Sequence, residues 1–267
     1  MGVLRLFFLI AALGSGLLQA AELKVAVGVQ DPQQVSLEGI LIPSATVGAD
    51  VVAATDELAK EICRRINASC SFHYVRFAEI LPGVEDGRFD LGFGNFLRTP
   101  KREQHVAFSD SIFRSSSRLV GLPATARAFA GRLGQPVTLD SLRGARVAAM
   151  EGSQQQEFLV GIAEQRQLTL VARPTMAEAV DALRQGNADF ALLPIREGYA
   201  MISRDNTARL AFVGPAVADR GLGNTVHIAM PRGKDALRRS INKAIAEVRA
   251  DGTAQRIMRR HFPVVLD

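Results

Sequence analysis

Residues 71–93 have the sequence SFHYVRFAEILPGVEDGRFDLGF, and this stretch decides the fold class. We interpret Ser71–Val75 as a strand, Ala78–Glu85 as a helix that Gly87 ends, and Phe89–Phe93 as a second strand. Strand, helix and strand in this order are typical of a mainly parallel sheet. The stretch therefore predicts an α/β protein.

The same alternation extends toward the N-terminus and begins again further along the chain. Leu23–Val29 is a β-branched run that predicts a strand, and Asp56–Asn67 has the apolar spacing of a helix. The second series consists of a strand at Ala145–Met150, a helix from Ser153, a helix at Met176–Arg184 and a strand at Asp189–Leu193. Two α/β lobes are therefore expected.

A short pattern occurs at a helix-to-strand junction in both series. Residues 86–91 are Asp-Gly-Arg-Phe-Asp-Leu and residues 185–190 are Gln-Gly-Asn-Ala-Asp-Phe, so both contain Gly-x-x-Asp before an apolar residue. Glycine can adopt the left-handed conformation that ends a helix. Each copy precedes a strand whose C-terminal end would face the gap between the lobes, where ligands bind in open α/β sheets.

The C-terminal region is expected to return to the first lobe. Asp235–Ala250 has the period of an amphipathic helix, and a second helix follows up to His261. The chain would then cross between the lobes twice, around residues 114–118 and 219–225, and the two crossings would form a hinge. The expected organisation is a signal peptide at 1–20, lobe 1 at 21–113 plus 223–267, and lobe 2 at 114–222.

The first 20 residues have the features of a signal peptide. Arg5 precedes an apolar run from Leu6 to Leu18, and small residues follow at Ala20 and Ala21. The run is shorter than the roughly 20 residues that span a bilayer. We therefore expect cleavage near Ala20 and a soluble protein in the periplasm.

Charge and histidine placement argue against two classes of function. Without Arg5, Lys and Arg number 31 against 27 Asp and Glu, a net charge of about +4. The basic residues are scattered, and Arg256, Arg259 and Arg260 alternate with apolar residues as on a solvated helix face, so no nucleic-acid partner is expected. The four histidines lack the spacing of metal ligands, and no cofactor or metal is expected.

Cys63 and Cys70 are the two cysteines of the chain. Export would bring them to an oxidising compartment, which favours a disulfide between the end of one helix and the start of the next strand. Two buried thiols are the alternative.

Several motifs, in order along the chain, resemble one known family. They are Leu58–Asn67 with Cys70 following, Thr99-Pro100-Lys101-Arg102, Phe108-Ser109-Asp110, Ser141-Leu142-Arg143-Gly144, Gly152-Ser153 and Arg249-Ala250-Asp251-Gly252-Thr253. Together they are similar to the lysine/arginine/ornithine- and histidine-binding periplasmic proteins over nearly the whole chain after the leader. The resemblance implies a two-lobed periplasmic binding protein fold of type II that closes on an amino acid. It also implies a Cys63–Cys70 disulfide and delivery to the membrane permease of an ABC transporter.

Arg102 is the first candidate for binding a ligand carboxylate. It lies just beyond the strand that ends near Asn95, and it matches the family's carboxylate-binding arginine. The guanidinium group offers a carboxylate a planar, bidentate fork of donors. The alternative is a surface arginine in a loop that also contains Arg98 and Lys101.

Ser153 and Gln154 are candidates for the same carboxylate. Ser153 precedes a helix and Gln156 follows three residues later, which is the pattern of a capping box. Helix N-termini attract anions, and the family uses this turn to bind the ligand carboxylate. A helix cap without a ligand is the alternative.

Four further positions complete the predicted ligand site. Phe77 matches a family position that packs on the ligand side chain, and Asn95 matches one that helps to hold the ligand, although both could be ordinary structure. Leu97 stands where the family has a serine. Pro194 stands where the family has the carboxylate that binds the ligand's α-amino group, and Arg196 lies nearby.

The absence of a carboxylate at Pro194 changes which ligands are expected. A buried ammonium without an acceptor costs several kcal/mol, which argues against an ordinary basic amino acid. An N-substituted amino acid, a keto acid or a dicarboxylate would avoid this cost. Alternatively, Asp31 or Glu38 supplies the acceptor from the first loop, where Gln30–Gln33 replaces the usual aromatic residue.

The expected function is that of a monomeric binding protein that delivers a small carboxylate, such as an amino acid, to an ABC importer. One alternative is an enzyme similar to cyclohexadienyl dehydratases, which share this fold, with Glu151 or His73 as acid or base. The other is a ligand-sensing partner of a membrane receptor. No Ser-His-Asp arrangement is recognisable, so an enzyme is not expected.

Overall fold

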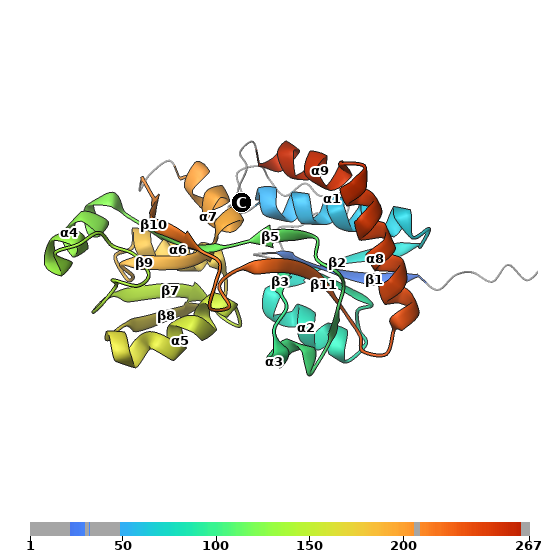
Figure 1. Ribbon diagram of the computed structural model, residues 1–267, viewed down its shortest axis with the longest axis horizontal. Coiled ribbons are helices and arrows are strands. Elements are labelled where there is room, and N and C mark those ends of the chain that lie inside the picture. Colours follow the sequence, from blue (N-terminus) through green and yellow to red (C-terminus); the bar gives the residue numbers. More distant parts are fainter. Residues whose placement is uncertain (1–21, 30–31, 33–48, 206–208, 263–267) are drawn as a thin grey trace, which may run out of the picture.

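The computed structural model describes residues 22–29, 32, 49–205 and 209–262, and these form two mixed sheets with helices on both faces of each (Figure 1). The predicted signal peptide, Asp31, Glu38 and most of Gln30–Gln33 lie outside the described residues.

The first sheet has the order β2-β1-β3-β11-β4, and β5 also pairs with β11. β1 is parallel to β2 and β3, whereas β11 is antiparallel to β3, β4 and β5. The strands are β1 (Leu23–Val29), β2 (Cys70–Arg76), β3 (Leu91–Leu97), β4 (Ala107–Phe108), β5 (Phe113–Ser115) and β11 (Asn224–Met230).

Alternate residues of the first sheet face two separate cores. Val25, Val27 and Ile228 pack with α1 (Ala49–Arg65), α8 (Asp235–Ala250) and α9 (Thr253–His261), while Ala26 and Ala229 pack with α2 (Phe77–Glu85) on the opposite face. The short helix α3 (Pro100–Glu103) follows β3. α8 and α9 therefore return to the first sheet, as predicted.

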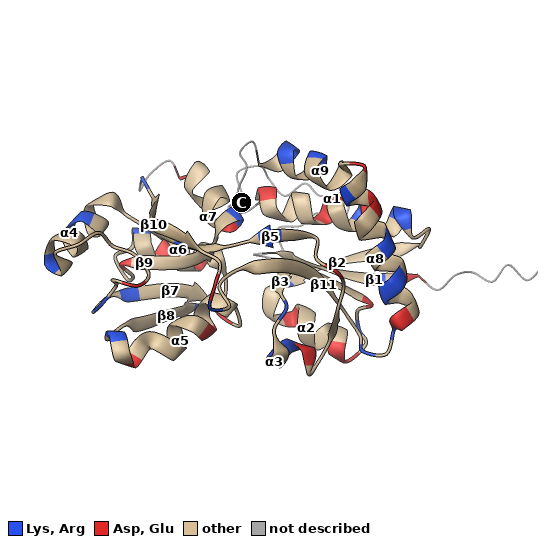
Figure 2. Cartoon of the chain, viewed as in Figure 1, with Lys and Arg blue, Asp and Glu red and all other residues tan. Residues whose placement is uncertain are grey.

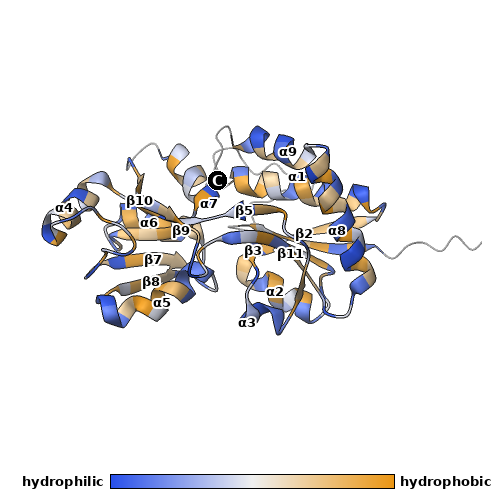
Figure 3. Ribbon diagram, viewed as in Figure 1, coloured by the Kyte–Doolittle hydropathy of each residue, from blue (hydrophilic) through white to orange (hydrophobic). Residues whose placement is uncertain are grey.

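The second sheet has the order β10-β6-β9-β7-β8. Its strands are β6 (Ser117–Gly121), β7 (Arg146–Met150), β8 (Thr169–Arg173), β9 (Phe190–Pro194) and β10 (Ala211–Val217). Helices α4 (Pro123–Leu133) and α5 (Gln154–Arg166) pack on one face, and α6 (Met176–Arg184) and α7 (Ile195–Ser203) on the other. Figure 3 shows the apolar residues of both halves concentrated on the strands and on the helix faces toward them.

The chain crosses between the sheets twice, as predicted. β5 pairs in the first sheet and β6 in the second, so the first crossing is at Ser116. The return crossing joins the end of β10 at Val217 to the start of β11 at Asn224. Both connections lie side by side in the middle of Figure 1. The residue limits of the two lobes stay a prediction.

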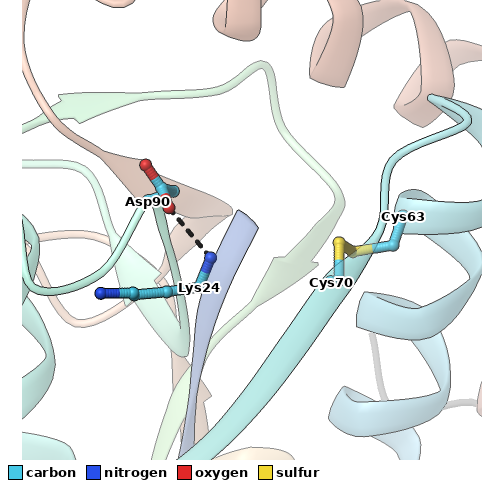
Figure 4. The surroundings of a disulfide bond; sticks show 4 residues. All are labelled: Lys24, Cys63, Cys70 and Asp90. Carbon is cyan, nitrogen blue, oxygen red and sulfur yellow. Dashed lines mark hydrogen bonds between the residues drawn. A yellow bond between two sulfur atoms is a disulfide. The ribbon is translucent and has the colours of Figure 1, made fainter. Parts of the chain in front are cut away.

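The repeated Gly-x-x-Asp pattern has the same structural role in both sheets. Gly87 and Gly186 have φ values of 78° and 70°, the predicted left-handed conformation. The aspartate then accepts a hydrogen bond from the backbone N–H that begins the neighbouring parallel strand, Asp90 from Lys24 at 2.9 Å (Figure 4) and Asp189 from Arg146 at 2.8 Å. The pattern therefore sets the register of β1 with β3 and of β7 with β9.

Cys63 and Cys70 form the predicted disulfide, with their Cα atoms 6.4 Å apart. The bond joins the last turn of α1 to the first residue of β2 (Figure 4). The disulfide therefore lies at the N-terminal end of β2, whereas α2 follows the C-terminal end of this strand. Neither cysteine lines the pocket described below.

Several predicted bounds differ from the structure by one or two residues, and two differ by more. α1 begins at Ala49 rather than at Asp56, because its first turns are small residues that pack on α7, with Ala54 and Ala200 in one buried cluster. β3 covers Leu91–Leu97 rather than Phe89–Phe93, because its second half pairs with β11, which is far away in sequence.

The basic residues near the C-terminus lie on a solvated helix face, as predicted. Arg256, Arg259 and Arg260 of α9 are exposed, while Ile257 is buried. The basic residues of α9 are the blue segments of this helix in Figure 2. Within the described ranges, no helix has the length and apolar character needed to cross a bilayer. The same residues contain no cluster of three His, Cys, Asp or Glu side chains that could hold a metal ion.

Candidate ligand-binding site

A pocket lies between the two sheets, near the C-terminal ends of β3, β7 and β9. Such strand ends are the usual ligand site of open α/β sheets. All eight residues predicted from the sequence to contact a ligand line this pocket: Phe77, Asn95, Leu97, Arg102, Ser153, Gln154, Pro194 and Arg196. Their contact with a ligand stays a prediction, but the structure brings them together.

Arg102 is buried, with 8% of its surface exposed. Thr99 caps α3 by accepting from the Arg102 backbone N–H, and the short helix carries the side chain back toward the end of β3. Its Nη1 donates to the Leu97 carbonyl at 2.9 Å and its Nη2 to the Gly152 carbonyl at 3.2 Å, across the gap between the sheets. The guanidinium also lies over the Phe96 ring at 5.4 Å. The alternative of a surface arginine is therefore wrong.

The charge of Arg102 has no counter-ion among the described side chains. No carboxylate lies within salt-bridge distance of it, and burial lowers the pKa of Arg102 to about 10, with the Glu157 charge acting weakly in the opposite direction. A desolvated guanidinium at a pocket wall favours the approach of an anion.

Ser153 caps α5, as predicted. Its Oγ accepts from the Gln156 N–H at 3.1 Å and donates to the Met150 carbonyl at 2.6 Å. The reciprocal half of the capping box differs, because Gln156 Oε1 accepts from the Gly152 N–H rather than from Ser153. The Gln154 side chain donates to Glu157, so what the turn offers a ligand is the free N–H groups of the first turn of α5.

Asn95 and Glu197 connect the two sides of the pocket. Asn95 lies in β3 with φ of 54°, a left-handed conformation that is uncommon outside glycine, although asparagine tolerates it better than most residues. Its Nδ2 donates to Glu197 Oε1 at 3.0 Å. Glu197 lies in the first turn of α7, directly after β9, and only 6% of its surface is exposed. Burial raises the pKa of Glu197, against the opposing effects of its backbone N–H, of Asn95 and of the Arg196 charge.

The remaining predicted residues shape the walls. Phe77 begins α2 and packs on Phe96, with ring centroids 4.9 Å apart, and it contacts the apolar clusters of both halves. Pro194 ends β9 and precedes α7. The Arg196 guanidinium lies 3.8 Å over the Phe113 ring.

Sequence reasoning missed seven lining residues, and Glu197 and Gln155 are among them. Gln155 is buried, and its Nε2 donates to Ser117 Oγ at 2.8 Å, while Ser117 Oγ donates to the Leu222 carbonyl. This chain of hydrogen bonds ties the start of α5 to both crossings between the sheets. An acidic residue in the first turn of a helix that directly follows a strand was the available signal for Glu197.

The residues considered for an enzyme lie elsewhere. His73 is an exposed residue of β2 that contacts Phe89, and Glu151 is exposed in the turn before α5. Neither lines the pocket. His227 is buried and its two ring nitrogens are hydrogen-bonded to the Ser109 carbonyl and to Thr225, as in a core histidine.

Comparisons with known proteins agree with this architecture. The chain is 29% identical over 245 residues to the histidine-binding periplasmic protein of Salmonella typhimurium, covering 90% of this chain and 87% of that protein. It is 28% identical over 219 residues to the lysine/arginine/ornithine-binding periplasmic protein of Escherichia coli, covering 80% of each.

A solved structure has the same fold. An ancestral arginine-binding protein bound to arginine superposes with a TM-score of 0.73 at 22% identity, covering 91% of this chain and 99% of that one. The predicted fold class, a type II periplasmic binding protein with two α/β lobes, is thereby confirmed.

The sequence model of one family, the bacterial extracellular solute-binding proteins of family 3, matches residues 46–264. This match includes both sheets except β1, and it contains the whole pocket lining. The chain therefore belongs to the bacterial extracellular solute-binding proteins, family 3.

Proposed function

We propose that this solute-binding protein captures an amino acid, or a closely related small carboxylate, in the pocket between its two sheets. The observation that carries the proposal is Arg102, a buried guanidinium at the pocket wall with no carboxylate partner among the described side chains. A ligand carboxylate would provide the missing charge, and the free N–H groups at the start of α5 would add donors from the other half.

The names of the relatives support the ligand class. The relatives are named for binding histidine, lysine, arginine and ornithine, and the ancestral structure holds arginine. All of these ligands carry an α-carboxylate. The shared feature of the ligands is therefore the group that Arg102 is suited to bind.

We further propose that the protein works as a monomer in the periplasm, after removal of residues 1–20, and delivers its ligand to the permease of an ABC importer. The proposal includes no catalysis, because the relatives are named as binding proteins and because His73 and Glu151 lie away from the pocket. In the closed state Arg102 and Ser153 come from different lobes, so ligand affinity includes the free energy of closure.

Thermal unfolding with matched ligand pairs tests the proposal. Each standard L-amino acid and L-ornithine is compared with its decarboxylated amine, for example L-arginine with agmatine and L-histidine with histamine. A ligand at 100 times its Kd stabilises the folded state by about 2.7 kcal/mol. We expect stabilisation by at least one amino acid and none by its amine. Equal stabilisation by both members of a pair would contradict the role given to Arg102.

A further inference from the structure

Glu197 is a buried carboxylate that lines the same pocket as Arg102. No described side chain forms a salt bridge with it. Pro194, which ends β9 at the pocket wall, has no acceptor in its side chain. Glu197 follows three residues later and is therefore the acceptor that β9 and α7 bring to the pocket.

The described donors to Glu197 leave part of its acceptor capacity free. Asn95 Nδ2 donates to Oε1 at 3.0 Å, and the backbone N–H of Glu197 also favours the charged carboxylate. An ionised carboxylate offers about four acceptor positions. An ammonium group has three donors and one positive charge, so it supplies both the hydrogen bonds and the charge that burial makes necessary.

Fold position and backbone conformation also favour a binding role. Glu197 occupies the third position of α7, where the helix N-terminus stabilises negative charge. Its partner Asn95 keeps a left-handed conformation inside a strand, and such conformations are concentrated at functional sites. The Asn95–Glu197 hydrogen bond joins one half of the protein to the other, so it sets the direction of the carboxylate at the gap between them.

We propose that Glu197, positioned by Asn95, binds the α-ammonium group of the ligand while Arg102 binds the α-carboxylate. This inference rests on the proposed function and restricts the class of ligands that the protein binds. It selects zwitterionic α-amino acids with a free amino group, and it disfavours keto acids, N-acylated amino acids and dicarboxylates. Pro194 then causes no loss of the amino-group site, because Glu197 supplies it.

Isothermal titration calorimetry with paired probes tests the inference. The probes are L-arginine, L-histidine and L-glutamine and the Nα-acetyl derivative of each, in which the amino charge is removed and the carboxylate is kept. The variant is Glu197→Gln, which keeps the shape of the side chain. The matched control is Glu178→Gln, which removes a carboxylate from the same helix position of α6, where the side chain is exposed and outside the pocket.

For at least one probe, we expect the wild type to bind the free amino acid about 100-fold more tightly than its Nα-acetyl derivative. In Glu197→Gln, the affinity for the free amino acid should fall about 100-fold, and the affinity for the derivative should change little. In Glu178→Gln, both affinities should match those of the wild type. Wild-type affinity in folded Glu197→Gln, or equal affinity of the wild type for both members of a pair, would overturn the inference and leave the proposed function standing. If the wild type binds none of the six probes, and no amino acid in the wider thermal panel, the proposed function fails as well.

A second variant addresses the positioning role of Asn95. Asn95→Gly removes the amide and tolerates φ of 54°. It should weaken the affinity for the free amino acid about 10-fold and the affinity for the Nα-acetyl derivative clearly less. Equal weakening of both probes would show a general effect on closure and would contradict a role in orienting Glu197.

Discussion

Replacing Arg102 by methionine should separate ligand binding from folding. Methionine has a similar length and no charge, so the variant removes the guanidinium and leaves only a small cavity. In the wild type, burial lowers the pKa of Arg102 well below its ordinary value, to about 10. At about 1.36 kcal/mol per pH unit, the buried charge costs the free protein about 3 kcal/mol.

That cost is largely offset in the free protein. Arg102 donates hydrogen bonds to the carbonyls of Leu97 and Gly152 and lies over the Phe96 ring, and each contact contributes about 1 kcal/mol. The free energy of unfolding without ligand should therefore change by less than about 1 kcal/mol in Arg102→Met. The free energy of ligand binding should change much more than the free energy of unfolding, because two charge-assisted hydrogen bonds to a carboxylate contribute about 1.5–3 kcal/mol each.

The expected loss in affinity is at least about 100-fold, since about 1.4 kcal/mol corresponds to a factor of ten. Titration calorimetry measures the affinity for the amino acid that stabilises the wild type most, and urea unfolding measures the stability of the free protein. Arg98→Met is the control, because Arg98 belongs to the same loop but forms an exposed ion pair with Glu103. An affinity within threefold of wild type in Arg102→Met would refute the reasoning.

Three further predictions concern stability and specificity. Arg64, and to a smaller extent Arg65, hold the pKa of Glu61 at about 2, against the effect of burial. Because this pKa is depressed, the stabilisation is present above about pH 4.5 and is lost as the pH falls through 2. Glu61→Gln should therefore lower the free energy of unfolding by about 1 kcal/mol at pH 7 and by almost nothing below pH 2 in urea titrations. Replacing Cys63 and Cys70 by alanine should cost about 2 kcal/mol in the same assay, with unchanged ligand affinity by calorimetry. Pro194→Asp, added to Glu197→Gln, should restore preference for a free amino acid over its Nα-acetyl derivative.

The elements with strong local signals were predictable from the sequence. The helices at Met176–Arg184 and Asp235–Ala250 have the predicted bounds, because amphipathic spacing and a following turn define them without help from distant residues. The Gly-x-x-Asp pattern also gave the correct backbone conformation at Gly87 and Gly186.

Elements that depend on distant partners were less predictable. β3 contains Gly92, Gly94 and Asn95, which are uncommon in strands. A Cβ atom at Gly92 would approach Ile80 Cγ2 to 2.6 Å, so the glycine reflects the close packing of α2. The pairing with β11 makes this segment a strand, and no local signal reports a partner 130 residues away.

The candidate site was predicted in outline. The resemblance to a family gave Arg102 and the turn at Ser153, and the structure brings both to one pocket. Glu197 was missed because the resemblance points to the position of Pro194 at the end of β9, whereas Glu197 lies in the first turn of α7. This helix follows the strand, and only the hydrogen bond from Asn95 of β3 shows that the Glu197 carboxylate faces the other half of the protein.

Native mass spectrometry of the protein purified from the periplasm tests the central claim most directly. The bound small molecule is released from the protein and identified from its mass and fragments. The account predicts a molecule that carries an α-carboxylate and a free α-amino group. A bound molecule without a carboxylate, or an empty protein that no amino acid stabilises, would contradict it.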